Sequence, residues 1–153
     1  MSQIQSLNEL INKFQTWVDA HYIIKEFRFG HIDTFDIEKW NEFPMFQVIP
    51  PSVTYATGAK TFSFQIILAD LPRDKETKTD YQKEVLSDLQ QIVEDFIANV
   101  MTNRQVFGEL ISVQNVSIEP FIEEFANVLT GWTITFDMVV PYYWSSCDTP
   151  SSI

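Results

Sequence analysis

WTITFDMVV, residues 132–140, is the stretch of this sequence that decides the fold. Apolar side chains occupy every second position from Trp132 to Val140. Thr133, Thr135 and Asp137 occupy the first three positions between them. Because successive side chains of a β-strand point to opposite faces of a sheet, this period of two predicts a strand buried on one face. Residues 61–69 show the same alternation, with Phe62, Phe64, Ile66 and Leu68 on one face, and predict a second such strand.

Shorter or weaker signals predict the remaining strands. They lie at residues 22–30, 45–49 and 110–119, and the strand that contains WTITFDMVV is expected to span 130–142. A short strand or turn is expected between residues 33 and 44. Residues 119–128 are expected to form a short helical turn, because Phe121, Phe125 and Val128 recur at helical spacing.

Two helices are predicted from apolar residues that recur every three or four positions. The first spans residues 4–20, and the second, about 79–103, keeps the pattern for more than four turns. Because the strands are grouped rather than alternating with helices, we expect an α+β fold. Its largely antiparallel sheet would be flanked by the N-terminal helix and the one long helix. Residues 1–153 are expected to form a single structural domain, with exposed loops at 52–60 and 71–80 and a C-terminal arm at 141–153.

The composition excludes several classes of function. A net charge of -11 argues against a general nucleic-acid binder, which needs lysine and arginine to contact phosphates. Cys147 is the only cysteine, so no disulfide can form within the chain. No segment approaches the roughly 20 consecutive apolar residues of a membrane span, and no membrane partner is expected.

A search for reactive groups finds no catalytic pattern. His21 and His31 stand in no metal-ligand spacing, and the four glycines form no phosphate-binding motif. Pairs of acidic residues are numerous, but 21 acidic side chains produce such pairs by chance. We therefore predict no enzyme, no cofactor and no metal, while a Cys147 nucleophile or a carboxylate pair stays open as a rival.

Several aromatic residues lie outside the predicted core faces. Trp40 and Tyr55 are two of them, and Tyr142, Tyr143 and Trp144 follow one another after Pro141. Either the three consecutive rings fold back on their own domain or they dock on a neighbouring subunit. Tyrosine and tryptophan concentrate in the hot spots of protein interfaces, which favours contact with a partner.

Four stretches of the chain carry a resemblance to a known family. They are the run at 43–50, the strand at 62–70 with its charged loop, the helix from Thr79, and the segment 129–132 leading to 141–144 and 147–150. This layout resembles the tail-terminator or tail-completion proteins and neck-ring proteins of tailed bacteriophages. The closing block is similar to that of phages of Bacteroidetes-type hosts, including crAss-like phages.

The resemblance implies a six-fold or twelve-fold homo-oligomeric ring at the phage head–tail junction. DNA would pass through its centre without sequence-specific binding, and portal, neck or tail proteins would lie above and below. The chain would belong to the virion and to the host cytoplasm during assembly. Exposed loops and the C-terminal arm would contact the neighbouring subunit, and the candidate interface residues are Tyr55, Lys60, Arg73, Lys75, Tyr142, Tyr143 and Trp144.

An alternative function stays open. A cytosolic domain that binds a small ligand or peptide could use the aromatic face of the sheet. The acidic charge fits the ring, because carboxylates lining a channel would repel the phosphates of passing DNA.

Overall fold

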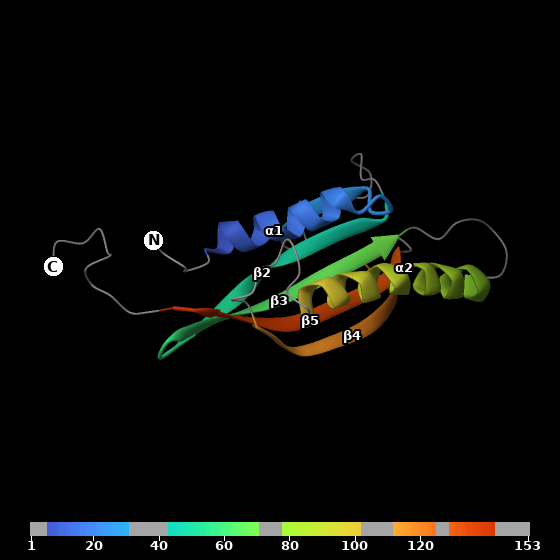
Figure 1. The fold of residues 1–153 in the computed structure, drawn as a ribbon. Coiled ribbons are helices and arrows are strands. Elements are labelled where there is room, and N and C mark those ends of the chain that lie inside the picture. The colour runs from blue at the N-terminus through green and yellow to red at the C-terminus, as the bar shows by residue number, and fades with distance from the viewer. Residues whose placement is uncertain (1–5, 31–42, 71–77, 102–111, 125–128, 143–153) are drawn as a thin grey trace.

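A computed structural model describes residues 6–30, 43–70, 78–101, 112–124 and 129–142. Within these residues, two helices and five strands follow one another in sequence (Figure 1). Their bounds are α1 Leu7–Ala20, β1 Glu26–Phe29, β2 Met45–Ala56, β3 Ala59–Asp70, α2 Lys78–Met101, β4 Ser112–Glu124 and β5 Leu129–Pro141.

The five strands form one sheet in the order β1-β2-β3-β5-β4. β2, β3, β5 and β4 are antiparallel to their neighbours, whereas β1 at the margin runs parallel to β2. Both helices pack on the same face of the sheet, as Figure 1 shows. The predicted α+β class, with a mostly antiparallel sheet flanked by an N-terminal helix and a long second helix, is confirmed.

Aromatic side chains fill the space between the helices and the sheet. The ring of Phe14 in α1 meets Phe64 of β3 edge to face at 5.0 Å and Phe136 of β5 at 6.2 Å. Phe96 of α2 packs against Trp17 of α1 at 5.2 Å, so that the two helices also contact each other. All five side chains are buried, which removes several hundred Å² of apolar surface from water. The alternation of β3 and β5 places these rings on the helix-covered face.

β3 and β5 approach each other closely at the middle of the sheet. A side chain at Gly131 would overlap the backbone oxygen of Leu68, so only glycine fits there. The next residue, Trp132, donates a hydrogen bond from its indole Nε1 to the carbonyl oxygen of Leu86 in α2 over 2.9 Å. This bond joins the sheet directly to the backbone of the long helix.

The N-terminal helix is shorter than the expected 4–20. It begins at Leu7 because Ser6 caps it, with the backbone N–H of Glu9 donating to Ser6 Oγ over 3.2 Å. Residues 4 and 5 lie outside the described residues. The expected strand at 22–30 is confined to Glu26–Phe29, where the chain pairs with β2.

The loop expected at residues 52–60 is wrong in extent. β2 continues past Pro50 and Pro51 to Ala56, and β3 begins at Ala59, so the turn between them is Thr57 and Gly58 alone. Gly58 adopts φ +81°, a backbone conformation that this two-residue turn requires. Glycine adopts it without steric cost because it has no Cβ atom. The two prolines are accommodated because the pairing of β2 with β3 is irregular between Ile49 and Ser52.

The helical turn expected at residues 119–128 is also wrong where the structure describes it. β4 extends to Glu124, and its backbone pairs with β5 through Glu119 opposite Thr133 and Ile122 opposite Thr130. The ladder to β5 satisfies backbone groups that a single helical turn would leave unpaired. Residues 125–128 lie outside the described residues. So do residues 33–42 of the strand or turn expected at 33–44. Of the loop expected at 71–80, residues 71–77 lie outside the described residues, and residues 78–80 belong to α2.

Candidate functional site

The β2–β3 hairpin ends in a tip that reaches beyond the helices at one end of the molecule (Figure 1). The end of β5 lies beside this tip, where the backbone N–H of Tyr142 donates to the carbonyl oxygen of Gly58 over 3.1 Å. The chain therefore continues into residues 143–153 from the hairpin tip. The side chains of Tyr55, Lys60, Phe62 and Tyr142 meet here, and we call them the tip cluster.

Strand register brings the tip cluster together. Tyr55 of β2 stands opposite Lys60 of β3, and Lys60 stands opposite Val140 of β5. Tyr142 follows Val140 by two positions and so falls on the same face of the sheet. The rings of Tyr55 and Tyr142 are 5.2 Å apart with an interplanar angle of 62°. The cluster occupies the helix-side face, past the part of the sheet that the helices cover.

Lys60 is the buried charged member of the cluster. Its side chain is only 7% exposed, and its Nζ lies 5.3 Å from the ring centre of Phe62 and 5.4 Å from that of Tyr142. Both distances are within the range of cation–π attraction. Burial lowers the pKa of Lys60 below its usual value, and the negative charge of Glu9 in the first turn of α1 partly offsets that effect.

The outer part of the cluster is exposed. Tyr55 is 51% exposed, although one edge of its ring contacts Tyr142. The cluster thus has a buried cation against the ring of Tyr142, and the ring of Tyr142 in turn contacts that of Tyr55. Such a fixed aromatic pair loses little side-chain freedom when another surface covers it, which is a property of interface hot spots.

Three of the seven candidate interface residues, Tyr55, Lys60 and Tyr142, are brought together by the fold. Arg73, Lys75, Tyr143 and Trp144 lie outside the described residues. Sequence reasoning missed two participants, Phe62 and Glu9, and it placed Lys60 in an exposed loop. One signal was present, because Lys60 is in phase with the apolar positions that follow it in β3.

A small pocket lies at another part of the molecule. Its volume is about 180 Å³, and it is lined by Ile23, Pro44, Asp70, Asp88, Leu89, Gln91 and Ile92. The lining contains two carboxylates and one amide but no nucleophile, imidazole or positive charge.

The remaining polar contacts are local or link elements. His21 Nε2 lies 3.3 Å from Asp95 Oδ2 and connects the end of α1 to α2, while Arg28 contacts Glu26 within β1 over 3.0 Å. In the described part of the chain, histidine, cysteine and acidic side chains form no group of three that could hold a metal ion. Among the described residues, no helix combines the length and apolar character that a membrane span requires.

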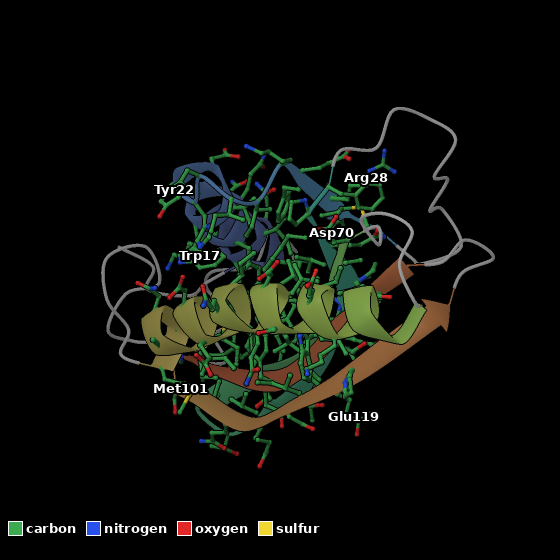
Figure 2. All side chains as sticks on the ribbon, turned by 90° about the vertical axis from the view of Figure 1, so that its right-hand side faces the viewer. Trp17, Tyr22, Arg28, Asp70, Met101 and Glu119 are labelled. Atoms are coloured by element: carbon green, nitrogen blue, oxygen red, sulfur yellow. The ribbon has the colours of Figure 1, made fainter. Side chains whose placement is uncertain are left out.

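Tyr22 provides an internal contrast to the tip cluster. It follows α1 at the end of the molecule away from the hairpin tip and is 86% exposed (Figure 2). Its ring stacks only on that of His21, at 5.9 Å. It is an exposed tyrosine without the support that Lys60 and Tyr142 give to Tyr55.

No protein-family model matches this sequence, and no curated protein matches it. The function is therefore inferred from the tip cluster and from the sheet that positions it.

Proposed function

We propose that this chain is a virion structural protein that forms a ring at the head–tail junction of a tailed phage, as a tail terminator or neck ring. The observation that supports this most directly is the tip cluster. It combines the exposed Tyr55 and the partly buried Tyr142, whose rings contact each other, with the end of β5. Together with the family resemblance of the layout, it favours contact between subunits over catalysis.

In this proposal each subunit presents the tip cluster and its C-terminal arm to a different surface of the next subunit. Such heterologous contacts close into a ring when the rotation from one subunit to the next is a whole fraction of a full turn. Here that fraction is one sixth or one twelfth. Tyr55 and Tyr142 supply rigid aromatic area at the contact, and Tyr143 and Trp144 extend it. Other phage neck, portal or tail proteins contact the two faces of the ring.

The charge of the chain agrees with a passage for DNA. With 21 acidic and 10 basic side chains, the subunit repels phosphate groups overall. DNA can then pass through the ring without adhering to it. The proposed location is the virion, and the host cytoplasm before assembly is complete.

The test compares two exposed tyrosines. Tyr55→Ala removes half of the supported pair, whereas Tyr22→Ala removes an exposed ring at the far end and serves as the matched control. We expect Tyr55→Ala, and a chain ending at Tyr142, to stay folded by circular dichroism but to lose ring assembly. Ring assembly is measured by light scattering coupled to size exclusion and by incorporation into purified particles.

Tyr22→Ala should assemble like the wild-type chain. The particle measurement matters because some ring subunits assemble only on a neighbouring ring, so a free monomer is compatible with the proposal. Purified particles that lack this polypeptide, or that contain it as single copies, would overturn it. Equal loss of assembly in both tyrosine variants would remove the tip cluster from the interface.

The alternative, a cytosolic domain that binds a ligand on the aromatic face of the sheet, is not favoured by the packing. Phe62, Phe64 and Phe136 on that face are all 3% exposed or less. Phe14 of α1 already contacts Phe64, and Phe96 of α2 contacts Phe136. A ligand would have to displace a helix, and that cost lowers its affinity. A large thermal shift on addition of a ligand would therefore favour the alternative.

A further inference from the structure

His21 follows the last residue of α1 and is held in place from several sides. Its backbone N–H donates to the carbonyl oxygen of Val18 over 3.0 Å and so caps the helix. Its ring lies 5.1 Å from that of Trp17 and stacks on that of Tyr22 at 5.9 Å (Figure 2 shows Trp17 and Tyr22 at this end of the molecule). The side chain is 13% exposed. The imidazole is therefore fixed in one orientation.

The two ring nitrogens have different partners, and these determine where the neutral ring carries its proton. The backbone N–H of Ile23 donates to His21 Nδ1 over 3.4 Å, so Nδ1 offers a lone pair and holds no proton. Nε2 then carries the single proton of the neutral ring and donates it to Asp95 Oδ2 of α2 over 3.3 Å. Neutral His21 thus makes one hydrogen bond to each partner.

A second proton on the ring affects these two bonds in opposite ways. It can bind only at Nδ1, where it would face the N–H of Ile23, and two donors cannot form a hydrogen bond with each other. The same proton makes the ring a cation, so that its contact with the Asp95 carboxylate becomes an ion pair. Protonation therefore exchanges the bond to Ile23 for a stronger contact with α2.

The surrounding charges favour this exchange. The charged and titratable groups on the neighbouring described elements include Asp19 of α1, Tyr22 and Lys25 of the connection to β1, and Asp88 and Asp95 of α2. Of these, Asp95 contacts a nitrogen of the imidazole. The ammonium group of Lys25 instead donates to the carbonyl oxygen of Tyr22 over 3.3 Å. A positive charge on His21 is thus matched by the carboxylate of Asp95.

The segment that protonation would release is short, because the chain is fixed again directly after Ile23. Ile24 is 6% exposed and belongs to the core, and the backbone N–H of Lys25 donates to the carbonyl oxygen of Pro44 over 2.9 Å. Ile23 itself is 39% exposed and lines the pocket of about 180 Å³, as does Pro44. Release of the Ile23 N–H therefore frees one wall of this pocket while the wall at Pro44 stays in place.

We propose that His21 is a proton-operated switch for Tyr22 and Ile23. Protonation releases the N–H of Ile23 and loosens that wall of the pocket, while the pair with Asp95 keeps the end of α1 on α2. Histidine is the side chain whose charge ordinarily changes between about pH 5 and 8, and the transition belongs in that range. The switch uses no contact between subunits, so it is independent of the proposed ring.

NMR spectroscopy of the full chain with His31→Gln tests the switch, because His21 is then the only histidine. At about pH 8 the ¹⁵N shifts of the ring should show a proton on Nε2 and none on Nδ1. From there to about pH 5 the protection factor of the Ile23 amide should fall about fivefold, as expected for one lost hydrogen bond. Its midpoint should equal that of the imidazole, the methyl resonances of Ile23 should shift with it, and the amides of α2 should keep their protection.

Two variants separate the parts of the switch. His21→Asn keeps a side-chain acceptor for the N–H of Ile23 but cannot be protonated, so the transition at Ile23 should disappear. Asp95→Asn keeps an acceptor for Nε2 but removes the negative charge, so the midpoint should fall by about 0.5 pH unit. Glu84→Gln is the matched control, because it removes a charge from the same helix about three turns away. It should leave the midpoint unchanged, since that distance exceeds the screening length of roughly 8 Å.

Four results would overturn the proposal. They are a neutral ring with its proton on Nδ1, an Ile23 amide whose protection does not change through the imidazole transition, and an Ile23 transition that persists in His21→Asn. The fourth is a loss of protection in α2 at the same midpoint, because the two helices would then separate. If His31→Gln does not fold, the assigned His21 resonances of the wild-type chain give the same measurements.

Discussion

Two strand edges of the sheet, β4 on one side and residues 52–56 of β2 on the other, differ in sequence and in regularity. β4 is irregular, carries Pro120 and a charge at Glu119, and contains a left-handed residue at Asn115 (Figure 2 shows Glu119 on this strand). Residues 52–56 of β2 are regular and uncharged. A free strand margin is a template for pairing unless something prevents it. The difference indicates that β4 carries features that keep an edge strand from pairing, whereas residues 52–56 of β2 carry neither a charge nor a proline.

The two edges also differ in their backbones. On β4, irregular pairing breaks the even spacing of donors and acceptors, so a second strand cannot match it over many residues. Residues 52–56 pair with β3 one to one, so their donors and acceptors keep the regular alternation of an antiparallel strand.

The largest expected effect tests which backbone groups of the hairpin point to β3. Tyr142 donates to the carbonyl oxygen of Gly58, so odd-numbered residues of β3 direct their backbone groups toward β2, and Thr54 opposite Thr61 is a bonded pair. Thr54→Pro removes an N–H that points to β3, and should lower the free energy of unfolding by about 2–3 kcal/mol. Val53→Pro removes an N–H that points away from β3 and should cost at most about 1 kcal/mol. Urea denaturation of both variants measures this difference. Equal destabilisation would show that the outward and inward assignments are wrong.

The second prediction concerns the irregular margin. Asn115→Ala keeps a side chain at φ +55° and removes the bond from Asn115 Nδ2 to Asp137 Oδ2, which is 2.9 Å long. We expect a loss of about 1.5 kcal/mol in unfolding free energy, from backbone strain and the lost bond together. Asn115→Gly loses the bond but not the conformation, and should cost about half as much. A glycine variant no better than alanine would argue against strain at this position.

The third prediction removes the protection of β4. Replacing Glu119 with threonine and Pro120 with valine should lower the concentration at which the chain self-associates about tenfold, which corresponds to about 1.4 kcal/mol. The unfolding free energy should change by less than about 0.5 kcal/mol, since both side chains are exposed. Static light scattering against concentration gives the measurement. Ser117→Thr on the same strand is the control and should leave association unchanged.

The smallest effect concerns the buried cation of the tip cluster. Because burial lowers the pKa of Lys60, the unfolded chain holds this proton more strongly and Lys60 costs stability at neutral pH. Lys60→Met should therefore raise the free energy of unfolding by about 1 kcal/mol at pH 7. The gain should shrink as the pH rises from the lowered pKa, above which the native lysine is neutral, toward 10.5, where the lysine of the unfolded chain also becomes neutral.

Denaturation at several pH values measures this trend, with the exposed Lys25→Met as control. A gain independent of pH would assign the effect to packing. A net loss at pH 7 would show that the cation–π contacts to Phe62 and Tyr142 outweigh the cost of burial.

Much of the fold follows from local periodicity. The alternation in β3 and β5 and the three-four pattern of α2 are strong enough to predict those elements and the fold class. The pairing of β1 with β2 in parallel is not accessible in the same way, because four residues carry little pattern and the partner is distant in sequence. The spacing of Phe121, Phe125 and Val128 mimicked a helix, and a long-range ladder to β5 overrode it.

The candidate site was predicted in part. Tyr55 and Tyr142 were identified as rings outside the core faces, and the structure places them in contact with each other. The loop expected around Lys60 rested on its polar neighbours, whereas its phase with Phe62 decides that it is buried. Glu9 could not be found, because only the folded chain brings the first turn of α1 within electrostatic reach of Lys60.

The hydrogen bond from the Trp132 indole to the Leu86 carbonyl oxygen makes the fluorescence of Trp132 sensitive to the position of α2. A tryptophan that is half-buried against a helix changes its emission when that helix lifts and water reaches the ring. In a chain whose other three tryptophans are replaced by phenylalanine, Trp132 can thus reveal motion of α2 against an intact sheet, and assembly that stiffens this junction would be visible in fluorescence without any added label.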